Sequence, residues 1–146
     1  MKHPRIGIIG ATGYTGAELS RLLLKHPAVE LCLLTSESHA GGLLSDVHPQ
    51  FKGLMNLGLS SMKDADFQSL DLLFLALPHG VSMDFVKEHA NGEAKIIDLS
   101  GDFRLGSAEV YNQWYPKAHI YPEGFRDAVF GLPELFGPQV EHARLV

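Results

Sequence analysis

The stretch RIGIIGATGYTGAELSRLLLKH, residues 5–26, decides the fold. It opens with Arg5–Ile9, a short apolar run ending at a glycine, which is typical of a buried strand. A helix is predicted over Tyr14–His26, because three leucines there have the spacing of one helix face: Leu19, Leu22 and Leu23. A strand and a helix joined by a glycine-rich turn form the first half of a βαβ unit.

The turn between them carries glycines three residues apart, at Gly10, Gly13 and Gly16. Glycine accepts the positive φ that a tight turn requires and lets the backbone approach a pyrophosphate. The helix that follows offers free N–H groups and a partial positive charge to an anion. Thr12 and Thr15 could add hydroxyl donors. This context favours dinucleotide binding over the alternative, a glycine turn that serves only packing.

The rest of the chain alternates between expected strands and helices. Further apolar runs predict strands at Val29–Thr35, Leu72–Leu77 and Lys95–Leu99. Helices are expected at Leu43–Val47, Val81–Ala90 and Ser107–Tyr115, with helical turns at Asp64–Leu70 and Gln139–Ala143. The last residues, 144–146, resemble the start of another strand. This order predicts an α/β fold with a doubly wound parallel sheet, a Rossmann-like dinucleotide-binding domain over residues 1–146.

The end of the second predicted strand bears on the choice between NAD and NADP. An acidic residue there would bind the ribose hydroxyls of NAD and repel a 2′-phosphate. The strand ends at Thr35-Ser36, whose small hydroxyl side chains suit a phosphate, and Glu37 follows. We therefore expect NADP. Glu37 would favour NAD if it pointed inward, and the alternative is that its carboxylate is merely solvated.

Ligands of doubly wound sheets bind at the carboxyl ends of the strands, where two further loops are expected. One contains His79, which could contact cofactor or substrate but is more simply explained as an exposed loop residue. The other contains Arg104, whose guanidinium could hold a phosphate or carboxylate in a bidentate pair. The competing interpretation of Arg104 is a surface salt bridge to Asp102.

Composition excludes several classes of protein. The chain has 146 residues and a formal charge of −5, which argues against a nucleic-acid partner bound by a basic face. A single cysteine, Cys32, excludes an internal disulfide, and its place within a strand indicates a core thiol. The histidine spacing does not predict a metal site. The N-terminal apolar run is too short for a signal peptide or a membrane span, so a cytoplasmic protein without a membrane partner is expected.

Five stretches in order carry a family resemblance: GATGYTGAEL (residues 10–19), SDVHPQFKG (45–53), LALPHG (75–80), DLSGDFRL (98–105) and FGLPEL (130–135). Together they resemble the amino-terminal part of the N-acetyl-gamma-glutamyl-phosphate reductases, over essentially the whole chain. The resemblance implies NADPH-dependent reduction of N-acetyl-glutamyl 5-phosphate to the semialdehyde, with release of phosphate, in arginine biosynthesis. A cysteine nucleophile would form a thioester and a histidine would act as acid–base catalyst.

The resemblance also assigns site residues. It places a phosphate loop at Gly10, Thr12, Gly13, Tyr14, Thr15 and Gly16, an adenosine-ribose position at Ser36, and a stretch passing the nicotinamide at Leu77 and Pro78. It implies that Arg104 holds the substrate phosphate. Many members place an arginine close to where Glu37 stands, a departure that weakens the case for NADP.

No catalytic residue is expected within this chain. The family's Gly-Cys-Tyr-Pro-Thr motif, which carries the nucleophile, would lie a few residues past Val146, and Cys32 does not match it. The resemblance thus implies a chain that ends before the catalytic domain and is inactive alone, in a protein expected to be a homo-oligomer. Two alternatives stay open: a fragment like aspartate-semialdehyde dehydrogenase, and a non-catalytic nucleotide-binding module. A short-chain reductase is disfavoured because no Tyr-x-x-x-Lys pair is present.

Overall fold

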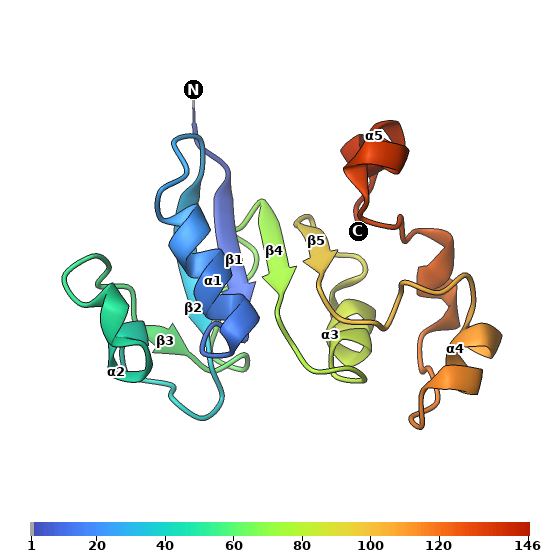
Figure 1. Cartoon of the computed structure of the whole chain (residues 1–146), viewed down its shortest axis with the longest axis horizontal. Helices are drawn as coiled ribbons and strands as arrows, with labels where there is room; N and C mark the ends of the chain where they lie inside the picture. Colours follow the sequence, from blue (N-terminus) through green and yellow to red (C-terminus); the bar gives the residue numbers. More distant parts are fainter. Residues whose placement is uncertain (1) are drawn as a thin grey trace. The chain divides into compact units, whose positions relative to one another are not determined.

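A computed structural model describes residues 2–146. The chain divides into two compact units, Met1–Ala76 and Leu77–Val146 (Figure 1). Each unit is described separately below. The sequence predicts a single domain over residues 1–146, and the division into two units does not test that prediction.

The first unit is built on parallel strands in the order β3-β2-β1-β4. Their bounds are β1 Arg5–Ile9, β2 Glu30–Thr35, β3 Leu59–Ser60 and β4 Leu72–Leu75. The central strand β1 pairs with β2 on one side and β4 on the other, so that Ile8 lies opposite both Leu34 and Phe74. Because all these strands run in one direction, their carboxyl ends lie along one edge, and this edge positions the candidate site.

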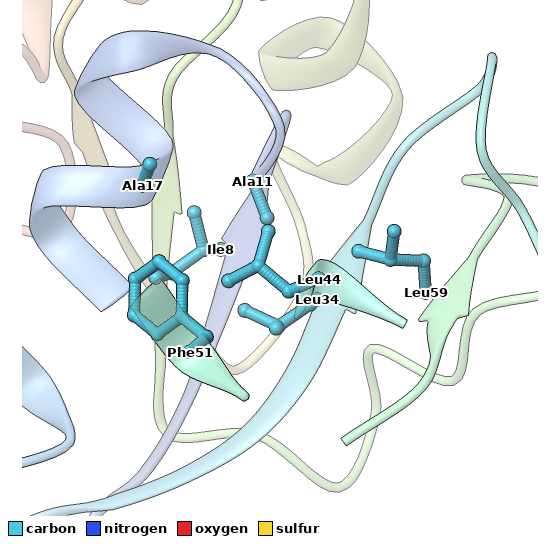
Figure 2. Close-up of a cluster of buried hydrophobic side chains, with 7 residues drawn as sticks. All are labelled: Ile8, Ala11, Ala17, Leu34, Leu44, Phe51 and Leu59. Atoms are coloured by element: carbon cyan, nitrogen blue, oxygen red, sulfur yellow. The ribbon is translucent and has the colours of Figure 1, made fainter. Parts of the chain in front are cut away.

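Helices of the first unit cover the sheet through an apolar cluster. They are α1 Tyr14–Leu23, α2 Leu44–Val47 and the 3₁₀ turn η1 Pro49–Phe51. Figure 2 shows the cluster, which draws side chains from these helices, from the strands and from the loop before α1: Ile8, Ala11, Ala17, Leu34, Leu44, Phe51 and Leu59. Burial of such side chains contributes roughly 1.5–3 kcal/mol each for the larger ones. The cluster therefore fixes α1 and the loop before it against the sheet.

The second unit contains α3 Ser82–His89, β5 Lys95–Asp98, α4 Ala108–Trp114, the 3₁₀ turn η2 Pro122–Arg126 and α5 Pro133–His142. The chain end runs beside β5 in parallel: Val146 N donates to Ile96 O at 2.9 Å and Asp98 N donates to Val146 O at 2.8 Å. Leu145 also forms a parallel bridge with Ala128 on its other side. The strand start expected at residues 144–146 is thus present only as isolated bridges at Leu145, and no strand is formed there.

The expected elements differ from the observed ones at a few places. Asp64–Leu70 forms no helical turn, since its backbone follows isolated turns and irregular structure. The helical turn expected at Gln139–Ala143 is the end of α5, which starts earlier, at Pro133, and is interrupted at Phe136 by non-helical backbone angles. Sequence inspection did not find β3, because a two-residue strand shows no periodicity. Within residues 2–146, no helix combines the length and apolar character needed to cross a bilayer.

Candidate functional site

The glycine loop lies at the carboxyl end of β1 and is bound to the end of β2. Gly10 has φ +86°, a left-handed conformation that favours glycine. The Gly10 N–H donates to the Thr35 side-chain oxygen at 3.2 Å, and the Ala11 N–H donates to the Thr35 carbonyl at 2.8 Å. Thr35 is fully buried. These bonds fix the loop where α1 begins.

Gly16 is required by close backbone contact. A Cβ added there would stand 2.6 Å from the Ala11 Cα and closer still to the Gly10 carbonyl oxygen. No side chain fits against backbone at that distance, so the start of α1 can lie this close to the loop only with glycine. The sequence interpretation of this loop as a strand–turn–helix unit is therefore supported by its packing.

The outer face of the same loop is open. A Cβ added at Gly13 would meet only the Gly10 carbonyl oxygen, at 3.7 Å. Tyr14 is 95% exposed and Thr15 is also exposed. The first N–H groups of a helix have no acceptor within the helix, and the first turn of α1 carries no acidic side chain to occupy them. The arrangement can bind an anion through backbone amides.

Thr12 and Ser36, predicted at separate positions in the sequence, meet in the structure. Their side-chain oxygens lie 2.9 Å apart in a hydrogen bond. His48, which sequence reasoning did not assign, holds the same loop, because its Nε2 lies 2.8 Å from the Thr12 carbonyl oxygen. The only sequence feature that could have indicated this role of His48 is its place in SDVHPQFKG, because a lone loop histidine has no distinctive spacing.

Glu37 is exposed but not merely solvated. Its carboxylate accepts a hydrogen bond from the Met62 N–H at 2.7 Å. The segment after β3 lies beside the end of β2, as Ser36 N also donates to Ser60 O at 2.9 Å. Glu37 is thus fixed in a bond to this neighbouring segment.

The second unit contains a cavity of about 510 Å³ beside the end of β5. Its lining includes Asp98, Ser100, Phe103, Arg104, Val129 and Phe130. Asp98 accepts bonds from the Ser100 N–H at 3.0 Å and hydroxyl at 2.8 Å, yet burial raises its pKa above the ordinary aspartate value. Arg104 is exposed, and its Nη2 reaches the Ser100 carbonyl at 3.5 Å. A guanidinium at a partly apolar cavity suits a small anionic ligand.

The alternative salt bridge between Arg104 and Asp102 is wrong, because Asp102 is fully buried and bonded elsewhere. Its carboxylate accepts bonds from Gly80 N at 2.9 Å, Met83 N at 3.0 Å and the Tyr111 hydroxyl at 3.1 Å. Burial, with the nearby charge of Asp102, raises the pKa of Tyr111 to about 12. Asp102 therefore joins the start of α3 to the loop that carries Arg104.

The residues predicted after β4 open the second unit. Leu77 is half-buried and Pro78 is exposed. Their place beside the nicotinamide stays a prediction. His79 is exposed, as the simpler interpretation held, but its Nδ1 also accepts a hydrogen bond from Gly101 N at 2.8 Å. It thus helps to hold the two loops of this unit together.

Cys32 differs from the expected core thiol, because it is only half-buried. Its thiol donates to the Glu30 carbonyl at 3.4 Å on β2. Across residues 2–146, no three His, Cys, Asp or Glu side chains gather in a way that could hold a metal ion.

His119 in the second unit predicts a pH dependence of stability. It is 7% exposed and packs against the rings of Phe103, Tyr111 and Phe125. Burial lowers its pKa, although Asp102 opposes that shift. As the pH falls toward the ordinary histidine pKa of about 6.5, His119 is protonated in the unfolded chain before it is protonated in the folded chain. The free energy of unfolding therefore decreases as the pH falls.

The measurement is the free energy of unfolding in urea between pH 7.5 and pH 5, compared with His119→Asn. Asn keeps an acceptor for the Tyr121 N–H, which bonds the histidine Nδ1 at 3.2 Å, but it does not titrate. We expect the variant to lose less stability than the wild type on acidification. An identical pH slope in both proteins would contradict this role of His119.

Comparison with known proteins identifies the family. The sequence profile described as "Semialdehyde dehydrogenase, NAD binding domain" matches residues 5–143. N-acetyl-gamma-glutamyl-phosphate reductase of Acidithiobacillus ferrooxidans is 46% identical over 97% of this chain and 41% of its own length. The [LysW]-L-2-aminoadipate/[LysW]-L-glutamate phosphate reductase of Saccharolobus solfataricus is 40% identical over the same shares of both chains. The chain thus spans about two fifths of the length of these relatives.

Solved structures show the same fold. Aspartate semialdehyde dehydrogenase II of Vibrio cholerae superimposes with a TM-score of 0.70 over 99% of this chain and 37% of that protein, at 14% identity. The aspartate semialdehyde dehydrogenase of Candida albicans, solved with NADP, gives a TM-score of 0.61 over 73% of this chain and 32% of that protein, at 22% identity. The fold is the Rossmann-like, parallel α/β arrangement expected from the sequence. The profile match over residues 5–143 shows that this chain belongs to the semialdehyde dehydrogenase family and carries the sequence of its NAD-binding domain.

Proposed function

We propose that this chain is the NADP-binding portion of an N-acetyl-gamma-glutamyl-phosphate reductase. The whole protein would reduce N-acetyl-glutamyl 5-phosphate with NADPH in arginine biosynthesis, in the cytoplasm and as a homo-oligomer. The curated relatives of that name, at 46% and 47% identity, support this substrate class. This chain would contribute cofactor binding and a substrate-phosphate contact.

The observation that carries the proposal is the glycine loop with its closed inner face and open outer face. The inner face packs Gly16 against the backbone, while nothing but one carbonyl oxygen lies within 4 Å of a Cβ at Gly13. A pyrophosphate fits this arrangement, because it needs backbone N–H donors and space for close approach. The donors would be the amides that open α1, at Tyr14, Thr15 and Gly16, together with the Gly13 amide, which now donates a long bond of 3.4 Å to the Gly10 carbonyl oxygen.

The hydroxyls of Thr12 and Ser36 would face the adenosine ribose and its 2′-phosphate. Their mutual hydrogen bond of 2.9 Å fixes both oxygens before a ligand arrives, which lowers the entropy lost on binding. Leu77 and Pro78 would pass the nicotinamide, as the sequence resemblance implies. When bound, the nicotinamide supplies the hydride for the reduction.

Arg104 would hold the phosphate of the substrate. Its guanidinium lines the cavity of about 510 Å³, and a planar guanidinium pairs with phosphate oxygens through two parallel hydrogen bonds. Asp102 would position this loop by fixing its backbone against the start of α3 at Gly80 and Met83.

Titration of the chain with NADPH, followed by nicotinamide fluorescence, tests the proposal. We expect saturable binding with a submillimolar dissociation constant and weaker binding of NADH, because the ribose end of the site offers hydroxyls suited to a phosphate. Lys25→Gln, at an exposed position past the end of α1, is a control that should bind NADPH like the wild type. An absence of saturable binding at millimolar NADPH would contradict cofactor binding by this chain.

A further inference from the structure

The residues that follow β2 provide no cation for the 2′-phosphate of NADP. Ser36 is followed by Glu37, Ser38 and His39, with neither Arg nor Lys among them. An arginine near this position is the usual means of accommodating a 2′-phosphate. A protein that prefers NADP therefore needs a positive charge from elsewhere in the fold.

The segment after β3 lies where such a charge is needed. β3 pairs with β2 in parallel, with Thr35 opposite Ser60, so both strands end at the same edge. Two bonds continue the contact beyond the strands: Ser36 N donates to Ser60 O at 2.9 Å, and Met62 N donates to the Glu37 carboxylate at 2.7 Å. The next residue is Lys63, which is exposed.

The turn that carries Lys63 is held in place. The Ser61 hydroxyl donates to the Asp64 carboxylate at 2.7 Å, and the Asp64 N–H donates back to the Ser61 oxygen at 3.2 Å. Three acidic groups lie near Lys63, and each accepts a hydrogen bond: Asp64 from Ser61, Glu37 from Met62, and Asp66 from the Gln68 N–H at 3.0 Å. Within residues 2–146, no salt bridge involves the Lys63 ammonium.

From this arrangement we infer that Lys63 is a specificity-determining residue, which supplies the positive charge for the 2′-phosphate of NADP. Glu37 is held in its bond to Met62, which limits how far its negative charge opposes the phosphate. The inference rests on the proposed function, in which Ser36 marks the adenosine-ribose position. It adds that preference for NADP over NAD comes from the turn after β3 and not from the residues directly after β2.

The test compares NADPH and NADH dissociation constants for the wild type, Lys63→Gln and Lys25→Gln. Both variants lose one positive charge from an exposed position of the first unit, but Lys25 lies at the far end of α1 from the glycine loop. We expect K63Q to weaken NADPH binding about fivefold, as for one exposed ion pair, and to leave NADH binding unchanged. The NADPH preference of the wild type should also decrease with salt, because exposed charges are screened.

Each outcome decides. If K63Q keeps the NADPH preference of K25Q, the inference is overturned while the proposed function stands. If that result comes with an NADPH preference that is lost in His39→Gln, the charge comes from His39 instead, and the assignment to Lys63 is equally overturned. If the wild type binds neither nucleotide, the proposed function itself fails, which is seen before any variant is compared.

Discussion

Gly16→Ala should disrupt both the stability of the first unit and the binding of NADPH. The new Cβ would stand 2.6 Å from the Ala11 Cα, inside backbone that cannot move without opening the loop. Overpacking of this kind costs about 1–3 kcal/mol or more. The loop must also widen, which displaces the amides at the start of α1. We therefore expect NADPH affinity to decrease about tenfold or more, which corresponds to about 1.4 kcal/mol. Urea unfolding and nicotinamide fluorescence measure the two effects.

Two matched glycine variants separate folding from binding. Gly13→Ala places a Cβ 3.7 Å from its nearest neighbour, and the residue has φ −71°, so the fold should tolerate it. Its methyl group would stand on the open face of the loop and should weaken NADPH without destabilising the chain. Gly106→Ala meets nothing within 4 Å and should change neither property. If G16A keeps the stability and the NADPH affinity of the wild type, the claim that Gly16 is required by close packing of the loop is refuted.

Asp102→Leu should be the most destabilising substitution in the second unit. It removes a buried acceptor and leaves the N–H groups of Gly80 and Met83 and the Tyr111 hydroxyl without it. Each buried donor left without an acceptor costs about 1–3 kcal/mol, so we expect the loss of Asp102 to cost about 3 kcal/mol or more. That is a large part of the roughly 5–15 kcal/mol that stabilises a folded domain. The measurement is the free energy of unfolding from urea titrations followed by circular dichroism.

Tyr111→Phe is the partial version of the same change. It removes only the hydroxyl bond of 3.1 Å to Asp102 and keeps the ring, which stacks on Tyr115 at 4.4 Å. We expect a loss of about 1.5–3 kcal/mol, the range for one hydrogen bond to a charged group. A cost of D102L no larger than that of Y111F would show that the two backbone bonds contribute little.

The sequence predicted best those features that depend on local pattern. The strand Arg5–Ile9 matches β1 at both ends, and the start of α1 at Tyr14 also matches. Apolar runs and leucine spacing are visible in one dimension, and a glycine-rich turn between them has few alternative structures. Thr12 and Ser36 were both predicted, but their direct hydrogen bond was not.

Features that depend on contacts between distant segments could not be predicted. Asp102 looked like a surface partner for Arg104 because the two are close in sequence, whereas its bonds go to Gly80 and Met83, about twenty residues earlier. Glu37 likewise bonds to Met62, after a strand too short to detect. Neither pairing leaves a periodic or compositional signal, since each depends on how parallel segments are brought side by side.

The most direct test of the central claim is a titration of ¹⁵N-labelled chain with NADPH, observed through backbone amide resonances. The claim is that the amides at the start of α1 bind the pyrophosphate. We predict saturable shifts at Gly13, Tyr14, Thr15 and Gly16 that are lost in Gly16→Ala. If the resonances of these amides do not shift at millimolar NADPH, or if the shifts are confined to other segments, the claim is contradicted.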